Sequence, residues 1–277
     1  MYKILTAILF CVLCQSPALS DTLNKESYVL GVVPQFEVRK LYAIWQPIID
    51  EIAMKTGIQI ELAPSKNIEE FEMEFAQQKF DFAYMNPYHM LVASEYGYEP
   101  LVRDTSKMLY GILVVRSDSD IRSPSDLNDK VIAFPSPNAL GASLQMRQEL
   151  HDQFGIQIRP NYVKTHDSVY LNVILDEAVA GGGVQKTLSR QPLNYQEQVR
   201  IVHKTTPVSP HPVAIRASLP APLKASIKRA FIAMGEEQEG QKKLAKIPIK
   251  RIGPAGMEDY LPLKKMGLDR FYVKPGA

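Results

Sequence analysis

The sequence predicts an α/β protein built as two lobes, in which strands alternate with helices. Strand and helix patterns follow one another with short connections over residues 28–85, as in a parallel sheet covered by helices. A comparable alternation restarts near Gly111, and the proline-rich segment 205–212 then leads into one more strand. We therefore expect two α/β lobes, with the proline-rich segment as the return crossover to the first lobe.

Two helices separate the predicted strands of the first lobe. Apolar residues recur at helical spacing from Leu41 to Ile52, and Gly57 is a typical helix end. Asn67, with Glu70 three residues later, predicts a capping box, so a second helix is expected through about residue 78. The strands themselves are predicted at residues 28–33, 59–62 and 80–85.

The second lobe is predicted to contain helices over residues 139–154 and 169–175, with a short helix after Val184. The run Gly181–Gly183 lacks the Lys-Ser or Lys-Thr of a phosphate loop, so we interpret it as a tight strand end beside a cleft. After a helix over 222–234, the tail is expected to pack back onto the first lobe. Strands are predicted at residues 112–116, 131–134, 162–164, 199–203 and 213–216.

The N-terminus has the pattern of a secretory signal peptide over residues 1–20. Lys3 precedes an apolar run that is too short to span a bilayer, and Ala18-Leu19-Ser20 provides the small residues of a cleavage site before Asp21. The only cysteines, Cys11 and Cys14, lie inside the run, and neither follows the small residue that a lipoprotein site requires. The sequence therefore predicts a periplasmic, cysteine-free mature protein.

Composition excludes several classes of function. The 277 residues carry a formal charge of +2, which falls to +1 without the leader, and no long basic run indicates nucleic-acid binding. No compact set of metal ligands such as H-E-x-x-H occurs, so we expect neither a metal nor a cofactor. Any preference for anions must therefore come from a local site on what we expect to be a monomer.

Three strand-to-helix junctions, at residues 86–89, 138–142 and 165–168, begin with residues that cap helices. In open α/β sheets, ligands bind beyond the carboxyl ends of strands, and the first turn of a helix offers unpaired amides and partial positive charge. We expect Asn86, Asn138, and either Asp167 or Ser168 to cap these helices. If the three helix starts converge, they form a site for an oxyanion.

Aromatic and histidine side chains near the same junctions are the expected walls of the cleft. Tyr84 and His166 are expected to face each other across it. His166, Asp167 and Ser168 could form a catalytic triad, but neighbours at such a turn point in different directions, and no G-x-S-x-G elbow occurs. The predicted ligand-binding residues are Gln35, Phe36, Tyr84, Asn86, Tyr88, His89, Tyr110, Asn138, Ala139, Leu140, Gly141, His166, Asp167, Ser168 and His211.

Several segments together resemble the phosphate, phosphite and phosphonate periplasmic binding proteins of ABC transporters, over essentially the whole mature length. The resemblance implies a type II periplasmic-binding-protein fold, in which two α/β lobes are joined by two crossover strands, near residues 109–112 and 206–212. A ligand is then buried at the hinge, and a membrane permease recognises the closed form. It also implies lobes formed by residues 21–111, 112–206 and 207–277, the last returning to the first lobe. The matching segments are Val32–Phe36 with Trp45-Gln46-Pro47, Asp81–Pro87, Tyr110–Val115 through Ser125-Asp126-Leu127, and Thr165–Ser168.

The loop after the strand at 131–134 departs from the family pattern. In phosphonate binders this loop resembles the pattern Pro-Asn followed by Ser-Thr-Ser-Gly. Here Pro137-Asn138 is followed by Ala139-Leu140-Gly141-Ala142. The amides remain, but each lost hydroxyl removes about 0.5–1.5 kcal/mol of binding free energy. His166 is a candidate replacement donor, and Asp167 would repel a dianion, so a protonated or zwitterionic ligand is expected to fit better. A sensor subunit of a membrane receptor and, less favoured, a hydrolase are the alternative functions.

Overall fold

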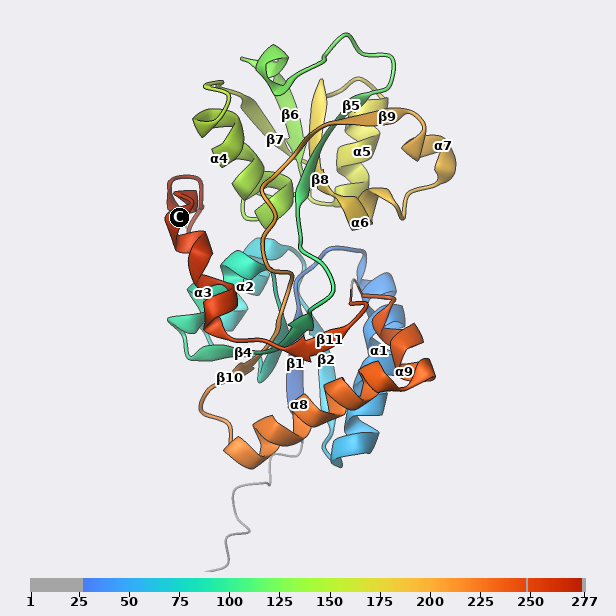
Figure 1. Ribbon diagram of the computed structural model, residues 1–277, viewed down its shortest axis with the longest axis vertical. Helices are drawn as coiled ribbons and strands as arrows, with labels where there is room; N and C mark the ends of the chain where they lie inside the picture. Colours follow the sequence, from blue (N-terminus) through green and yellow to red (C-terminus); the bar gives the residue numbers. More distant parts are fainter. Residues whose placement is uncertain (1–26, 248, 276–277) are drawn as a thin grey trace, which may run out of the picture.

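The computed structural model describes residues 27–247 and 249–275 and contains two β-sheets, each covered by helices (Figure 1). The six-stranded sheet has the order β11-β4-β10-β3-β1-β2 and belongs to lobe 1. The five-stranded sheet has the order β7-β6-β8-β5-β9 and belongs to lobe 2. The two-lobed α/β architecture predicted from the sequence is confirmed. The predicted leader lies outside the described residues, and within them no helix has both the length and the apolar composition to span a membrane.

Lobe 1 combines a parallel βαβαβ unit with strands that return later in the chain. β1 pairs in parallel with β2 and β3, whereas β10 and β11 join the sheet through antiparallel pairs with β3 and β4. The strands are β1 (Tyr28–Val32), β2 (Ile60–Pro64), β3 (Phe82–Tyr84), β4 (Tyr98–Asp104), β10 (Val213–Arg216) and β11 (Ile252–Pro254). The helices are α1 (Val38–Thr56), α2 (Ile68–Ala76), α3 (Pro87–Ser94), α8 (Ala221–Glu236) and α9 (Gln238–Leu244).

Lobe 2 surrounds its sheet with shorter helices. A π-helical turn, Leu140–Leu144, follows β6 and continues directly into α4. The strands are β5 (Gly111–Arg116), β6 (Val131–Phe134), β7 (Arg159–Tyr162), β8 (Ala180–Val184) and β9 (Val199–Lys204). The helices are α4 (Gln145–Asp152), α5 (His166–Ile174), α6 (Gln185–Leu188) and α7 (Leu193–Gln196).

We expected the glycine run at 181–183 to form a strand end. Instead, it lies inside the fully buried strand β8. Small residues are needed there because elements pack closely on the strand. A Cβ on Gly182 would lie 2.0 Å from the carbonyl oxygen of Ala142, and a Cβ on Gly111 of β5 would lie 1.8 Å from that of Gly141. The two glycines therefore allow the π-helical turn to press against β5 and β8.

Two crossover segments connect the lobes, after β4 and after β9, and they pair with each other. The amide of Leu109 donates to the carbonyl of Val208, and the amide of Val208 donates back to Leu109, both at 2.8 Å. This pairing makes the crossovers a short two-stranded ribbon between the sheets (Figure 1).

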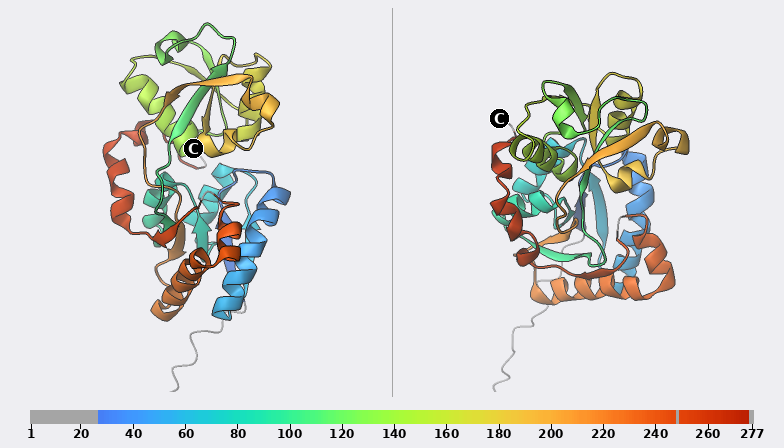
Figure 2. Two further views of the ribbon diagram at one scale, coloured as in Figure 1. Left: turned by 45° about the vertical axis from the view of Figure 1, so that its right-hand side comes forward. Right: turned by 45° about the horizontal axis from the view of Figure 1, so that its top comes forward.

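The C-terminal segment, residues 257–275, contacts both lobes and not lobe 1 alone. Asp259 pairs with Arg103 of lobe 1 at 2.7 Å, whereas Arg270 pairs with Asp152 at the end of α4 in lobe 2 at 2.6 Å. Figures 1 and 2 show this segment running along one side of the molecule from the lower to the upper lobe. The tail is therefore a third connection between the lobes.

Candidate functional site

The helix starts predicted at the three junctions are present, but at two of them the predicted residue does not cap the helix. Asn86 caps α3 as predicted, because its side chain accepts a hydrogen bond from the His89 amide at 2.8 Å. Helix α5 is capped by Thr165, whose hydroxyl accepts from the amide of Ser168 at 3.1 Å. The prediction of Asp167 or Ser168 as cap was therefore wrong. Lys164 has a φ of 72°, so the chain turns before Thr165 and the helix starts at His166.

The prediction that Asn138 caps the next helix was also wrong. That helix begins after Ala139 with no side-chain cap, and the Asn138 side chain points away from it. Its amide nitrogen lies 2.8 Å from Oε2 of Glu72 in α2 and donates to the carbonyl of Val273 at 2.7 Å. Its oxygen accepts from the Val273 amide at 3.0 Å. Asn138 therefore joins lobe 2 to lobe 1 and to the C-terminal segment.

A small pocket lies between the lobes at the π-helical turn, and we call it the amide pocket. Backbone hydrogen bonding of the turn begins at Ser143, whose amide donates to Ala139 at 2.8 Å, so the amides at 140–142 precede it. The cavity measures about 30 Å³, room for a few small groups in this conformation. It is lined by Val33, Pro34, Gln35, Ile68, Asn86, Leu109, Pro135, Ala139–Ala142, His166, Val184 and His211.

Two histidines from different elements face this pocket in the neutral state. Burial lowers the pKa of His166 to about 4, against a small opposing effect of Asp167. Burial, with repulsion from His89 and His166, lowers the pKa of His211 to about 3. Nε2 of His211 lies 3.2 Å from the side-chain nitrogen of Gln35. At neutral pH these rings can exchange hydrogen bonds with a ligand but add no charge.

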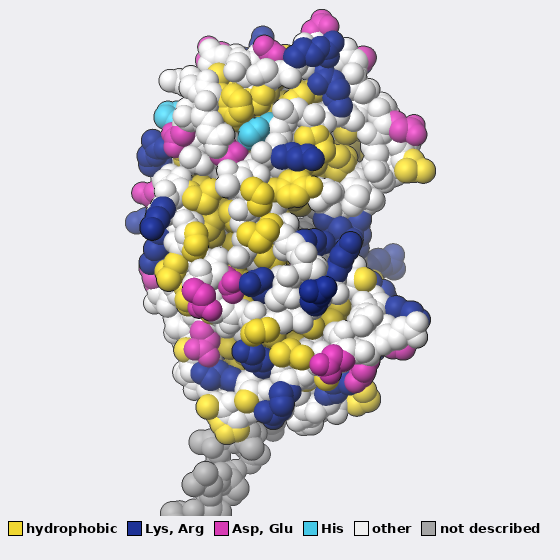
Figure 3. Space-filling view, in the orientation of Figure 1, with side chains coloured by type: hydrophobic (Ala, Val, Ile, Leu, Met, Phe, Trp, Pro, Cys, Tyr) yellow, Lys and Arg dark blue, Asp and Glu magenta, His cyan; other side chains and the backbone are white. Residues whose placement is uncertain are grey.

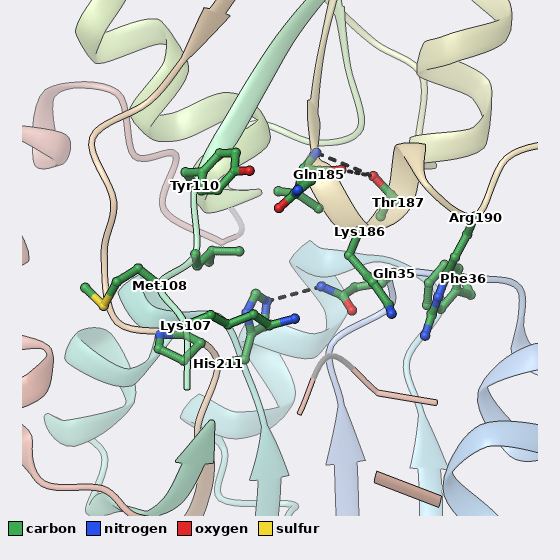
Figure 4. A pocket seen from close by; sticks show the side chains of 13 residues that line it. Gln35, Phe36, Lys107, Met108, Tyr110, Gln185, Lys186, Thr187, Arg190 and His211 are labelled. Carbon is green, nitrogen blue, oxygen red and sulfur yellow. Dashed lines mark hydrogen bonds between the residues drawn. The ribbon is translucent and has the colours of Figure 1, made fainter. Parts of the chain in front are cut away.

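A second pocket of about 50 Å³, the cationic pocket, adjoins the first through the shared residues Gln35, Leu109, Val184 and His211. Lys107 reaches it from the first crossover, while Lys186 and Arg190 point down into it from lobe 2 (Figure 4). Figure 3 shows Lys and Arg side chains gathered at the hollow between the lobes. The remaining lining residues are Phe36, Met108, Tyr110, Gln185, Thr187 and Pro210.

A comparison with protein-family models identifies the family of the chain. Residues 30–260 match the model of the ABC transporter phosphonate periplasmic substrate-binding proteins. The chain belongs to this family. Its members are periplasmic substrate-binding proteins and not enzymes, and the family places the protein in the periplasm as a component of an ABC transporter. The comparison with curated proteins found no match.

Solved structures with the same fold include members of phosphonate transport systems. A binding component of an ABC phosphonate transporter from Pseudomonas aeruginosa is 16% identical with a TM-score of 0.78, covering 87% of this chain and 85% of that one. PhnD1 from Prochlorococcus marinus, solved with methylphosphonate, is 13% identical with a TM-score of 0.81, covering 90% and 99%. A Xanthomonas citri protein solved with ATP is 16% identical with a TM-score of 0.73, covering 89% and 98%. At such identities the likeness establishes the fold.

Nine of the residues predicted from the sequence line the two pockets of this phosphonate-binding-family protein. They come from both lobes and from both crossovers, the first of which carries Tyr110 and the second His211. Their contact with a ligand stays a prediction. The nine are Gln35, Phe36, Asn86, Tyr110, Ala139, Leu140, Gly141, His166 and His211.

The other six predicted residues lie outside both pockets. Tyr84 is buried with its ring stacked on that of His211, so it does not line the cleft opposite His166, where we had expected it. Tyr88 contacts the ring of Tyr272 at 5.3 Å, and Asn138 forms the interlobe bridge. The last three form local bonds: His89 with Glu72 at 3.0 Å, Asp167 with Gln191 at 2.7 Å, and Ser168 with Thr165 at 2.8 Å.

These placements separate the members of the conceivable catalytic triad. Asp167 accepts from Gln191, Ser168 contacts Thr165, and Nδ1 of His166 lies 3.4 Å from the Thr187 hydroxyl. Asp167 also lines neither pocket, so the repulsion that led us to expect a protonated or zwitterionic ligand is not built into the cleft walls.

Sequence reasoning missed Lys107, Lys186 and Arg190. One signal for the latter two was present, because the segment after β8 is another strand-to-helix junction of the type that indicated the other candidates. Lys186 and Arg190, four residues apart, leave this junction on the same side. Lys107 gave no such signal, since it lies in a crossover without a regular pattern.

Proposed function

We propose that this protein is the periplasmic receptor of an ABC importer and captures a small phosphonate- or phosphate-like anion between its lobes. The observation that carries the proposal is the amide pocket, where helix-start amides of lobe 2 meet His166 of lobe 2 and His211 of the second crossover. The methylphosphonate complex of a protein with the same fold supports the ligand class.

The chemistry of the amide pocket suits an oxyanion. Amides at 140–142 can donate hydrogen bonds, the start of the helix adds partial positive charge, and no Asp or Glu among the described residues lines the pocket. His166 and His211 each carry one N–H when neutral, so they replace part of the hydroxyl donation that Ala139-Leu140-Gly141-Ala142 lacks. Such donors, shielded from water, bind an anion more strongly than exposed ones.

Closure couples binding to transport in this proposal. The leader is cleaved near Asp21, the mature protein binds its ligand as a monomer, and the lobes rotate about the paired crossovers at Leu109 and Val208. A permease then recognises the closed form. The protein releases its ligand unchanged and is not an enzyme.

A ligand screen on the mature protein tests the function. Phosphate, phosphite, methylphosphonate, methanesulfonate and 2-aminoethylphosphonate are compared by thermal shift and calorimetry. A true ligand at about 100 times its Kd adds roughly 2.7 kcal/mol to the free energy of unfolding. We expect a phosphorus oxyanion to stabilise the protein and phosphorus NMR to show it unaltered.

The control is a pair of neighbouring substitutions in α5. His166→Ala should weaken binding of that anion about tenfold, because one buried donor is lost. Ser168→Ala, two residues away and outside both pockets, should not. Stabilisation by none of the phosphorus oxyanions, or conversion of one to a product, would refute the proposal.

A further inference from the structure

The cationic pocket gathers positive side chains from separate parts of the chain. Lys107 comes from the first crossover, and Lys186 and Arg190 come from α6 and the turn that follows it. Lys250, just before β11, is close enough to add to the positive potential at Lys186. A mature protein of charge near +1 therefore concentrates three cations in one pocket, with Lys250 near enough to add to their potential.

These cations lack carboxylate partners. Within residues 27–247 and 249–275, Lys107, Lys186, Arg190 and Lys250 form no ion pair, although ten other Lys and Arg side chains do. Burial, followed by repulsion from Arg190, Lys107 and Lys250, lowers the pKa of Lys186. Burial also lowers the pKa of Arg190. The positive charges in the pocket thus have no carboxylate partner in the described part of the chain and repel one another, and a bound anion would reduce this repulsion.

Neighbouring contacts hold Arg190 over the cleft. Its guanidinium lies 5.0 Å from the ring centroid of Phe36, and it donates to the backbone carbonyl of Lys246. Phe36 and Lys246 belong to lobe 1, whereas Arg190 belongs to lobe 2. Arg190 therefore reaches across the cleft, and its charge is fixed beside the space that continues into the amide pocket.

We propose that the ligand carries a second anionic group, which binds at Lys107, Lys186 and Arg190 while its phosphonate or phosphate group lies in the amide pocket. This inference rests on the proposed function. The favoured ligand is then an organophosphonate or organophosphate with an acidic group at its other end. An aminoalkylphosphonate is disfavoured, because its ammonium group would face three cations.

A matched ligand series tests the proposal on the mature protein. Phosphonoacetate, 3-phosphonopropionate and 4-phosphonobutyrate are compared by calorimetry with ethyl-, propyl- and butylphosphonate, and 2-aminoethylphosphonate provides the opposite charge. We expect at least one carboxylate to bind about tenfold to a hundredfold more tightly than its uncharged counterpart, the range for a charge-assisted hydrogen bond. Ethylenediphosphonate then tests a second phosphoryl group in place of the carboxylate.

Two double variants locate the effect. Lys107→Gln with Lys186→Gln should remove most of the preference for the carboxylate and change the affinity for the uncharged-ended ligand about threefold or less. Arg229→Gln with Lys265→Gln removes equal charge from side chains outside both pockets and should leave the preference intact.

The outcomes distinguish this inference from the proposed function. If alkylphosphonates bind but no acidic analogue gains affinity, or if the gain survives loss of both lysines, the second subsite is refuted and the receptor function stands. Binding of 2-aminoethylphosphonate more tightly than the acidic analogues also overturns it. If phosphate or phosphite binds but no phosphonate does, the subsite alone is refuted. If none of the phosphorus oxyanions binds, the proposed function fails and the subsite fails with it.

Discussion

The ring of His211 stacks on the phenol ring of Tyr84, with centroids 5.3 Å apart and planes inclined by 23°. Trp45 of α1 contacts the same phenol ring at 4.9 Å, and both Trp45 and Tyr84 are buried. The hydrophobic core of lobe 1 thus extends through Tyr84 to the pocket and fixes the orientation of His211.

Replacement of Tyr84 should therefore affect stability first. Tyr84→Ala leaves a cavity under His211 and should lower the free energy of unfolding by about 3–5 kcal/mol. Tyr84→Phe keeps the ring stack and should retain ligand affinity within about threefold. Urea denaturation and calorimetry measure the two effects. A Tyr84→Ala protein as stable as the wild type would show that the aromatic stack does not stabilise the fold.

The stability of the protein should fall as the solution becomes mildly acidic. His166 and His211 have folded-state pKa values of about 4 and 3, below the unfolded value of 6.5. The unfolded state therefore binds more protons below pH 6.5, and stability is lost from there down to about pH 3. At pH 5.5 each histidine should cost about 1.4 kcal/mol relative to pH 7.5.

Urea denaturation of wild type and His211→Gln at the two pH values checks this dependence. In His211→Gln, the loss of stability between pH 7.5 and pH 5.5 should be about half that of the wild type. In His151→Gln, a change at an exposed site, this loss should equal that of the wild type. An identical loss of stability in wild type and His211→Gln would assign the effect to other groups.

Asn138→Asp should destabilise the contact between the lobes. The substitution places a carboxylate where an amide nitrogen now lies 2.8 Å from buried Glu72. Like charges in a buried site should cost about 3 kcal/mol or more at pH 7.5, measured by denaturation. Adding Glu72→Gln removes the repulsion and should restore most of the loss. Loss of binding with unchanged stability, the outcome expected for a residue inside the anion site, would contradict this role.

Gly182→Ala should weaken ligand binding by moving the π-helical turn. Its Cβ would lie 2.0 Å from the carbonyl of Ala142, so β8 and the turn must separate. The amides at 140–142 then leave their positions, and affinity should fall about tenfold or more. Calorimetry on folded protein measures this loss. Unchanged affinity would show that the amides at 140–142 do not contact the ligand.

Local patterns were sufficient for most of lobe 1. The apolar spacing of α1 placed Leu41 and Trp45 in the core, and Gly57 ends the helix with a φ of 73°. By contrast, β4 was not predicted, because Pro100 interrupts its pattern and cannot donate a ladder hydrogen bond. The sheet accommodates this proline beside an irregularity in the pairing of β4 with β10.

The second lobe and the site show where local patterns are insufficient. The strand predicted at 162–164 is β7, Arg159–Tyr162, an exposed edge strand that ends before the positive φ of Lys164. Asn138 is of a residue type that often caps helices. Its side-chain amide instead binds the carboxylate of Glu72, which is close in space but 66 residues away in the chain. Lys107 joins the site only because the first crossover passes beside α6. Such long-range contacts leave no periodic signal in the sequence.

The C-terminal segment constrains how the lobes can separate. It contacts both lobes on one side of the molecule, and the hollow where Lys and Arg side chains gather lies on the opposite side, with the crossovers between the two (Figures 1 and 3). A rotation axis near these connections produces an asymmetric opening, widest beside Lys186 and Arg190. An approaching anion then meets long-range attraction at the entrance before it reaches the buried, uncharged donors, so ionic strength should slow its capture more than its release.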